Sequence, residues 1–271
     1  MSDGYVIHGR LWPPQSDARP SAAFVYVHGI QSHGGWFEWS ASLLAQTGNP
    51  VLLPDRRGSG LNRQSPGDTP SAQRWLADID ELAAWLETHY GIERFSMVGV
   101  SWGGKPAVAW ALRNNERVER LLLVAPGVFP AVDLGIIGRS RVGWSLLFGG
   151  RRRFPIPLDD PRLFTDNPAG QAFINQDPLK LTHATARFLY QSSKLDRQLA
   201  KAATGSLRVP VALALAARDR IIRNSPTEQW LRRLAAQPVS VRVFPAAHTL
   251  EFEESVATFE GFIRQWAAGG P

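Results

Sequence analysis

The hexapeptide Gly99-Val100-Ser101-Trp102-Gly103-Gly104 follows an apolar run of strand length and precedes a helical pattern. A serine flanked by glycines at a strand-to-helix turn matches the pattern G-x-S-x-G. The glycines allow the strand and the helix to approach each other, because neither glycine carries a Cβ atom. We therefore predict that Ser101 is a nucleophile on a sharp turn, with backbone N–H groups of the helix start nearby.

Apolar runs of strand length recur on both sides of this turn, at residues 22–27, 50–54, 95–100, 120–125, 209–216 and 239–244. The runs are nearly continuous rather than alternating, which is typical of parallel strands covered on both faces. Helical patterns lie between them, as in residues 72–89, where apolar residues recur at three- and four-residue spacing. We therefore predict the α/β class, with a mostly parallel central sheet flanked by helices.

One long segment interrupts the alternation of strands and helices. Residues 128–205 are rich in Gly, Pro and Arg and contain a helical pattern from His183 to Leu199. A long excursion inside a compact domain is more often a lid or a binding element than a structureless loop. We expect a core formed by residues 1–127 and 206–271, with residues 128–205 inserted as a helical cap.

Candidates for acid–base chemistry follow the last two predicted strands. His248 comes shortly after residues 239–244 and is our candidate general base, and Asp219 comes shortly after residues 209–216 and is our candidate for the acid that orients it. The chain order Ser, Asp, His agrees with this assignment. A surface ion pair with Arg218 or Arg220 is the alternative for Asp219, and Asp196 is the second candidate for the acid.

The turn His28-Gly29-Ile30 ends an earlier predicted strand. We predict that the N–H groups of Ile30 and Trp102 form an oxyanion hole, and that His28 bonds neighbouring loops instead of acting as a base. The candidate substrate contacts are His33, Trp36, Trp144 and Phe148.

An apolar patch at Trp144, Leu146, Leu147 and Phe148 precedes Arg151-Arg152-Arg153. The patch could form the edge of a lid that touches lipid or an anionic head group. The alternative is a short cap helix that packs inward and has a solvated basic end, and this is the arrangement we expect.

The composition excludes several classes of function. The 271 residues include no cysteine, so disulfides, thiolate metal sites and a catalytic thiol are excluded. The net charge of +6 is carried mostly by scattered arginines, and we expect no nucleic-acid partner. No apolar run approaches the roughly 20 residues that cross a bilayer, and the first residues lack a signal-peptide pattern. We therefore expect a cytoplasmic protein without stable membrane insertion; the oligomeric state is left open.

Taken in order, these elements resemble the α/β-hydrolase superfamily over nearly the whole chain. Residues 28–62, HGIQSHGGWFEWSASLLAQTGNPVLLPDRRGSGLN, are similar to the matching region of bacterial lysophospholipase and monoacylglycerol-lipase-like hydrolases of the S33 serine aminopeptidase type. The resemblance implies an ester-hydrolysing enzyme with a helical cap, no metal and no organic cofactor. Two residues depart from it. Ser59 replaces the usual histidine of a GHG turn, and Trp102 replaces methionine or tyrosine, so that its ring would crowd the acyl pocket or offer a stacking face.

We therefore predict a serine hydrolase that cleaves a carboxylic ester of a hydrophobic acyl or lipid-like small molecule through an acyl-enzyme. The same triad also suits a thioester, an amide or a carbon–carbon bond, since fold does not determine function. A non-catalytic homologue that binds a small ligand is the alternative outside enzymes. Dehalogenase and epoxide-hydrolase chemistry is not expected, because those relatives carry an aspartate where Ser101 stands.

Overall fold

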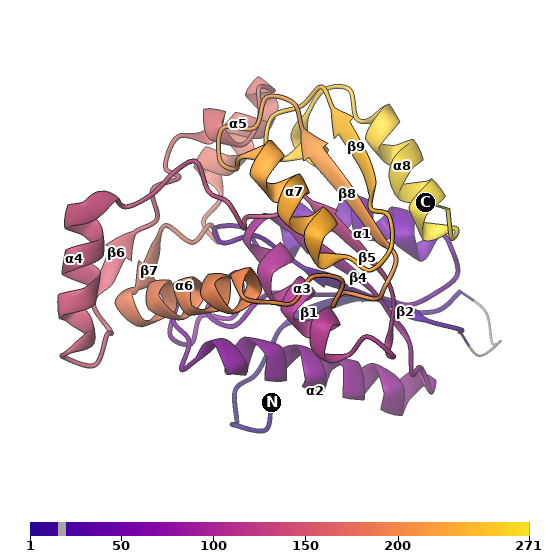
Figure 1. The fold of residues 1–271 in the computed structure, drawn as a ribbon, viewed down its shortest axis with the longest axis horizontal. Helices are drawn as coiled ribbons and strands as arrows, with labels where there is room; N and C mark the ends of the chain where they lie inside the picture. The colour runs from indigo at the N-terminus through magenta and orange to yellow at the C-terminus, as the bar shows by residue number, and fades with distance from the viewer. Residues whose placement is uncertain (16–19, 271) are drawn as a thin grey trace.

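The computed structural model describes residues 1–15 and 20–270 and contains a central seven-stranded sheet (Figure 1). Its order is β1-β3-β2-β4-β5-β8-β9, and only β1 runs antiparallel to its neighbour. The strands are β1 (Gly9–Trp12), β2 (Ala23–Val27), β3 (Val51–Pro54), β4 (Phe95–Val100), β5 (Val118–Val124), β8 (Val211–Ala216) and β9 (Ser240–Phe244). The predicted mostly parallel sheet is confirmed, with β1 as an additional edge strand.

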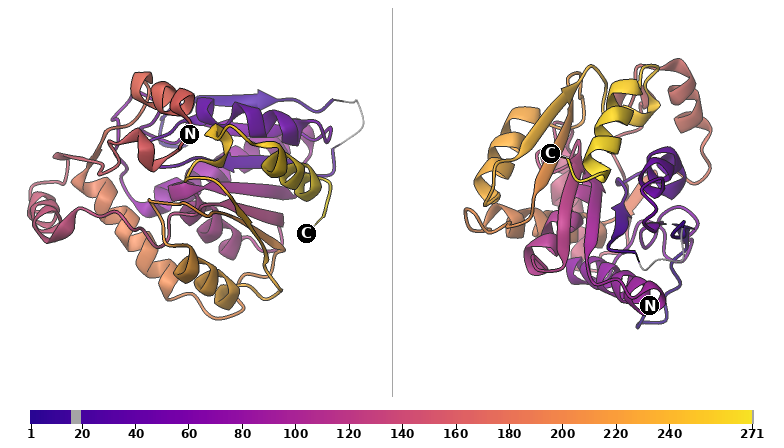
Figure 2. Two further views of the ribbon diagram at one scale, coloured as in Figure 1. Left: turned by 90° about the horizontal axis from the view of Figure 1, so that it is seen from above. Right: turned by 90° about the vertical axis from the view of Figure 1, so that its right-hand side faces the viewer.

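Helices cover both faces of the sheet (Figures 1 and 2). One face carries α1 (Glu38–Ala45) and α8 (Ala257–Ala267), and the other carries α2 (Ala72–Tyr90), α3 (Gly104–Arg113) and α7 (Asn224–Leu234). Every residue of β2, β4 and β8 is therefore buried. This double coverage explains why the strands appear in the sequence as continuous apolar runs.

Residues 128–205 lie on the side of the sheet toward which β8 and β9 point (Figure 1). They form α4 (Gly135–Leu146), β6 (Arg153–Pro155), α5 (Pro168–Gln176), β7 (His183–Thr185) and α6 (Ala186–Ala200). β6 and β7 pair as a separate antiparallel sheet. Because α6 packs against α2 and α3 as well as against α4, the division into core and cap at residues 128 and 205 stays a prediction.

Three of the four apolar residues at the end of α4 and in the turn after it are exposed, so our expectation that this patch packs inward was wrong. Trp144, Leu147 and Phe148 are 63%, 76% and 70% exposed. The physical reason is that Val142 and Leu146 already fill the surface that Phe154 of β6 and Ala186 of α6 offer to α4, which leaves Trp144, Leu147 and Phe148 to solvent. Within the described part of the chain, no helix is long and apolar enough to cross a membrane.

A carboxyl group inside the core joins three elements. Glu251 of η4 (Leu250–Phe252) accepts hydrogen bonds through Oε1 from Tyr26 Oη of β2 at 3.1 Å and from Ser40 Oγ of α1 at 2.6 Å. Its Oε2 is buried and has no hydrogen-bond partner among the described residues. Burial raises the pKa of Glu251 to about 7, so the carboxyl group is largely protonated below neutral pH.

We expect Glu251→Gln to change how stability depends on pH. In the folded protein the pKa of Glu251 is about 7, against 4.5 for the free side chain, so the folded state holds the proton more tightly. The free energy of unfolding should therefore fall by up to about 3 kcal/mol as pH rises from 4.5 to 7. Urea unfolding of wild type and variant at pH 5, 6, 7 and 8 measures the loss.

The glutamine cannot ionise, so the variant should lack this part of the loss and gain on the wild type as pH rises. Glu254→Gln, which changes an exposed carboxylate, is the matched control and should follow the wild type. Parallel pH curves for wild type and Glu251→Gln would contradict the assignment.

Candidate active site

Ser101 occupies a strained turn between β4 and α3. Its φ is +51°, a value that non-glycine residues rarely adopt and that costs on the order of 1–3 kcal/mol. The flanking glycines make the turn possible. A Cβ atom on Gly103 would lie 2.1 Å from the carbonyl oxygen of Val27, and one on Gly99 would lie 2.8 Å from Cα of Gly104. The turn therefore holds Ser101 at the end of β4 through backbone packing against β2.

His248 and Asp219 continue from Ser101 as a chain of hydrogen bonds. Ser101 Oγ lies 2.8 Å from His248 Nε2, and His248 Nδ1 lies 2.8 Å from Asp219 Oδ2. The side chains of His248 and Asp219 are only 3% and 1% exposed. With Nδ1–H donated to the carboxylate, the Nε2 lone pair faces the Ser101 hydroxyl. This arrangement can remove the hydroxyl proton during attack on a carbonyl carbon.

The backbone fixes the Asp219 carboxylate. Its Oδ1 accepts hydrogen bonds from the N–H groups of Ile221 at 2.8 Å and Ile222 at 2.9 Å. The alternative of a surface ion pair with Arg218 or Arg220 is wrong, because both guanidinium groups bind Asp166, at 2.7 Å and 2.9 Å.

The second candidate acid lies elsewhere. Asp196 of α6 binds Lys105 of α3 at 2.8 Å, and burial raises the pKa of Asp196. The carboxylate bonded to His248 therefore belongs to Asp219 and not to Asp196.

The loop after β2 lies against Ser101. A Cβ atom on Gly29 would be 3.3 Å from Ser101 Cβ and 3.7 Å from Ser101 Oγ. Ile30 follows Gly29 in this loop, and Trp102 follows Ser101 in the turn. The oxyanion hole formed by the N–H groups of Ile30 and Trp102 stays a prediction.

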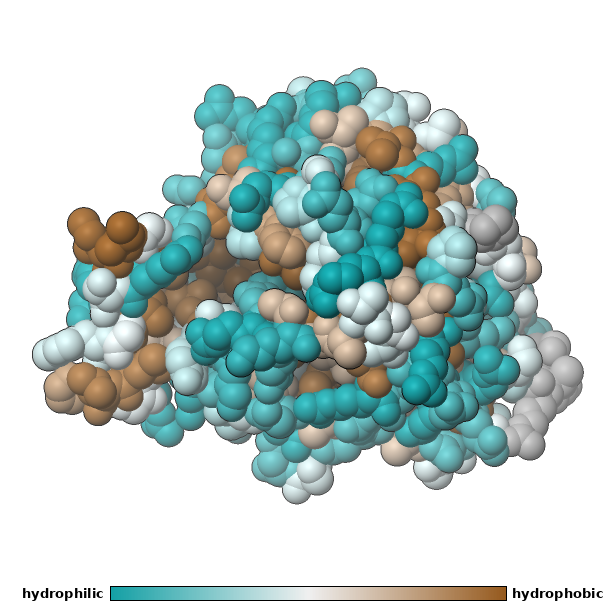
Figure 3. Space-filling model, viewed as in Figure 1, coloured by the Kyte–Doolittle hydropathy of each residue, from teal (hydrophilic) through white to brown (hydrophobic). Residues whose placement is uncertain are grey.

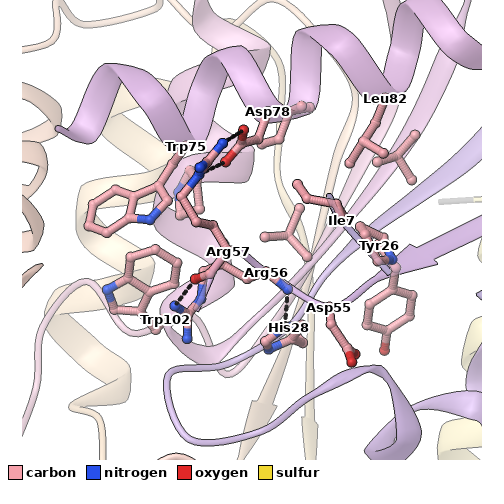
Figure 4. Close-up of a pocket in the computed structure, with 15 residues that line it drawn as sticks. Ile7, Tyr26, His28, Asp55, Arg56, Arg57, Trp75, Asp78, Leu82 and Trp102 are labelled. Carbon is pink, nitrogen blue, oxygen red and sulfur yellow. Dashed lines mark hydrogen bonds and ion pairs between the residues drawn. The ribbon is translucent and has the colours of Figure 1, made fainter. Parts of the chain in front are cut away.

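His28 is a structural histidine, as predicted. It is fully buried, and its Nε2 accepts the N–H of Arg56 at 2.8 Å (Figure 4). Ser59 Oγ lies 3.1 Å from the same Nε2. Since Nε2 is an acceptor, Nδ1 donates to the carbonyl oxygen of Gly29 at 2.9 Å. Burial lowers the pKa of His28 to about 3, so the ring is neutral at neutral pH. Ser59, which stands where the resemblance expects histidine, lies beside this ring.

Trp102 does not face a substrate, so the expectation that its ring crowds the acyl pocket or offers a stacking face is wrong. The ring is 4% exposed and its centroid lies 4.7 Å from that of Trp75 and 5.4 Å from that of Phe188. The Arg56 guanidinium lies over the ring at 4.8 Å from its centroid (Figure 4). Trp102 Nε1 donates a hydrogen bond to Ser192 Oγ. The turn at Ser101 directs this side chain between α2 and α6.

Asp177 connects residues 128–205 to the loop beside Ser101, a role that no local pattern in the sequence predicted. Its Oδ2 accepts hydrogen bonds from His33 Nε2 at 3.0 Å and from Trp36 Nε1 at 2.7 Å. The His33 and Asp177 side chains are 6% and 5% exposed. Nearby, the N–H of Leu181 donates to the carbonyl oxygen of Gln31 at 2.9 Å. The segment around Asp177 therefore holds residues 31–36 by several bonds.

The four candidate substrate contacts fall into two groups. His33 and Trp36 lie next to the loop beside Ser101, with their polar atoms bonded to Asp177. Trp144 and Phe148 lie exposed at one end of α4, where their rings pack against each other at 4.7 Å. The structure does not bring the second pair to the triad, and contact of any of the four with substrate stays a prediction. In residues 1–15 and 20–270, no group of three or more His, Asp or Glu side chains is arranged to hold a metal ion.

Comparison with known proteins gives a family match over most of the chain. The family described as "Serine aminopeptidase, S33" matches residues 18–255. A monoacylglycerol lipase of Mycolicibacterium smegmatis is 23% identical over 250 residues, which cover 90% of this chain and 86% of the lipase. An uncharacterized abhydrolase domain-containing protein of Dictyostelium discoideum is 27% identical over 238 residues, 86% of this chain. The chain spans less than half the length of the first curated relatives it matches.

Solved structures show the same fold. The crystal structure of Paleococcus ferrophilus monoacylglycerol lipase superimposes with a TM-score of 0.84 at 19% sequence identity, covering 97% of this chain and 98% of the lipase. The mostly parallel sheet with flanking helices is therefore the α/β-hydrolase fold.

We expect Asp177→Ala to loosen residues 31–36. The variant leaves two buried donors, His33 Nε2–H and Trp36 Nε1–H, without their acceptor, and each unsatisfied donor costs about 1–3 kcal/mol. Hydrogen–deuterium exchange of the peptides that cover residues 31–36 should accelerate markedly.

Arg187→Gln is the matched control, because it removes a different contact between residues 128–205 and the core, the ion pair with Asp68. It should leave exchange in residues 31–36 unchanged. Equal exchange of these residues in Asp177→Ala and the wild type would show that Asp177 does not hold the loop.

Proposed function

This chain belongs to the serine aminopeptidase S33 family and is an α/β-hydrolase of the monoacylglycerol-lipase-like type, and from this we propose that it hydrolyses carboxylic esters of hydrophobic acyl groups. Ser101 is the nucleophile, His248 the general base and Asp219 the acid that orients the histidine. The observation that carries the proposal is the unbroken chain of two 2.8 Å hydrogen bonds from Ser101 Oγ to Asp219 Oδ2.

The first half of the reaction forms an acyl-enzyme. Ser101 Oγ attacks the ester carbonyl carbon while His248 Nε2 takes the hydroxyl proton. The carbonyl oxygen becomes an oxyanion, which the N–H groups of Ile30 and Trp102 stabilise. The tetrahedral intermediate then collapses, the bond to the alcohol oxygen breaks, and His248 gives its proton to the leaving alcohol.

The second half releases the acid. A water molecule enters, His248 Nε2 takes one of its protons, and the hydroxide attacks the acyl carbon. Collapse of this second intermediate breaks the bond to Ser101 Oγ, which recovers its proton from His248. Asp219 holds the imidazole in one tautomer and stabilises its cationic form in both halves, and its position is fixed by two backbone N–H groups.

Hydrophobic surroundings support an acyl substrate. Figure 3 shows a recess with hydrophobic walls between α4 and the bulk of the molecule. Phe164 packs against His248 with ring centroids 6.2 Å apart, and Trp36 packs against Phe164 at 5.7 Å. Apolar and aromatic walls with few polar groups are typical of sites for lipid-like ligands. The names of the relatives also support a lipid-like ester, since two of them are monoacylglycerol lipases.

We expect wild type to hydrolyse p-nitrophenyl esters and Ser101→Ala to lose at least about a thousandfold in kcat/KM, because the variant lacks the attacking oxygen. A series of acyl chains from two to sixteen carbons should show an optimum above the shortest chain. Matched p-nitroanilide and thioester substrates should react more slowly. Turnover of the amide or the thioester faster than the ester would contradict the ester assignment. If no substrate is turned over but a ligand binds tightly, the chain would instead be a non-catalytic binding protein.

A pair of carboxamide variants tests the role of Asp219. Asp219→Asn keeps the size of the side chain but favours the wrong imidazole tautomer, and we expect a loss of about 10³- to 10⁴-fold in kcat. Asp196→Asn changes a carboxylate that binds Lys105 instead of His248, so kcat should stay within about threefold of wild type. Thermal melts of both variants separate loss of folding from loss of catalysis. If Asp196→Asn folds and loses more kcat than Asp219→Asn does, the assignment of Asp219 as the acid is contradicted.

A further inference from the structure

Arg56 carries a buried positive charge without a counter-ion. It lies two residues after β3, and its side chain is almost fully enclosed, with the residue 8% exposed. Its guanidinium forms no ion pair with any residue in the ranges 1–15 and 20–270. The neighbouring carboxylate of Asp55 pairs with Arg10 at 3.0 Å instead. A buried charge without a partner is costly to keep, and perturbed buried charges gather at functional sites.

The guanidinium is bonded to the loop after β2. Its Nη2 donates a hydrogen bond to the carbonyl oxygen of Ile30 at 2.8 Å. The backbone N–H of Arg56 donates to His28 Nε2 at 2.8 Å (Figure 4). Arg56 therefore holds this loop on both sides of Gly29, and Ile30 is the residue whose N–H we assign to the oxyanion hole.

The same guanidinium packs on the side chain that follows the nucleophile. Its Cζ lies 4.8 Å from the centroid of the Trp102 ring and 5.0 Å from that of Phe188. A cation is attracted to the face of an aromatic ring, and the attraction is larger when both groups are removed from water. Both rings are buried. Arg56 therefore contacts both residues whose N–H groups we assign to the oxyanion hole, Ile30 and Trp102.

The charge of Arg56 acts on its surroundings. Burial lowers the pKa of Arg56 to about 9, which leaves the guanidinium charged at neutral pH. After burial itself, this charge is the largest cause of the low pKa of His28, about 3. A positive charge that disfavours a second cation favours an anion, and the effect is strong where water is excluded. The negative charge that forms beside Gly29 when Ser101 attacks would therefore be stabilised.

The adjacent arginine shows a contrasting environment. Arg57 is also buried, but its guanidinium bonds to Asp78 of α2 at 2.7 Å and 2.9 Å and pairs with Asp3 at 3.0 Å (Figure 4). These bonds account for Arg57 as an ion pair within the fold. By contrast, Arg56 Nε is buried and has no hydrogen-bond partner among the described residues. Folding satisfies the Arg56 guanidinium less well, which indicates a role other than folding.

We propose that Arg56 is a positioning residue of the oxyanion hole. Its guanidinium holds the N–H groups of Ile30 and Trp102 in place and adds a positive potential where the oxyanion forms. Arg56 acts through these two residues and not on the substrate itself. The inference rests on the proposed ester hydrolysis and assigns a further residue to that reaction.

Kinetics of three variants on a p-nitrophenyl ester test the proposal. Arg56→Met keeps an unbranched side chain but removes the charge and the hydrogen bonds, and we expect kcat to fall about a hundredfold with KM within about threefold of wild type. Arg56→Lys keeps a charge and a donor, so its kcat should stay within about tenfold of wild type. Arg57→Met is the matched control. It removes a buried guanidinium that is already paired, so it should lower the Tm but leave kcat within about threefold.

A pair of ketones separates stabilisation of the oxyanion from binding of the acyl chain. With octyl trifluoromethyl ketone, Ser101 Oγ adds to the carbonyl carbon, His248 takes the hydroxyl proton, and the carbonyl oxygen becomes an oxyanion. Octyl methyl ketone has the same chain but a less electrophilic carbonyl, so it reports binding without this step. Arg56→Met should raise the inhibition constant of the trifluoromethyl ketone by about the factor lost in kcat/KM, and that of the methyl ketone by no more than about threefold.

Three results would overturn the inference. One is a folded Arg56→Met with wild-type kcat, and another is an Arg56→Lys that is no more active than Arg56→Met. The third is an equal rise in the inhibition constants of both ketones, which would indicate a collapsed site. Thermal melts establish folding, and Arg56→Gln takes the place of Arg56→Met if the latter does not fold.

The experiment also separates this inference from the proposed function. Absence of wild-type turnover of any ester would overturn the proposed function and this inference with it. An active wild type, an inactive Ser101→Ala and an unchanged Arg56→Met would overturn this inference alone.

Discussion

The close approach of β2 to the turn after β4 is the constraint on which the site depends. The carbonyl oxygen of Val27 lies where any side chain at position 103 would have to stand. This approach holds Ser101 at a positive φ and brings it within 2.8 Å of His248 and against Gly29. Three loops from three strands therefore meet at one point because two glycines permit backbone contact. The strain at Ser101 persists because the sheet packed around it fixes the turn.

Local patterns in the sequence predicted most of this architecture. Continuous apolar runs indicated buried parallel strands, and Ser101, Asp219 and His248 could be named because each follows such a run. The structure brings these three side chains together. Contacts between distant segments could not be predicted in the same way. Asp177 lies 144 residues from His33 in the chain, and no local pattern connects them.

The wrong predictions for Trp102 and Trp144 have the same origin. The ring of Trp102 turned away from the site because α2 and α6 offered aromatic neighbours and a hydroxyl acceptor, none of which the sequence around residue 102 reveals. The exposure of Trp144 depends on how much surface β6 and α6 leave for α4. Amino-acid identity sets the preference of a side chain, but its neighbours decide which surface it meets. The placement of both side chains could therefore be found only from the tertiary structure.

The bonds of Asp177 limit how freely residues 128–205 can be exchanged. Here a foreign segment without an acceptor at position 177 would leave His33 and Trp36 with unbonded buried donors, and loss of the backbone bond from Leu181 would free Gln31. A chimera would then carry a disordered loop beside Ser101 even though its core sequence is intact. Residues 128–205 and the loop at residues 31–36 would therefore have to be exchanged together.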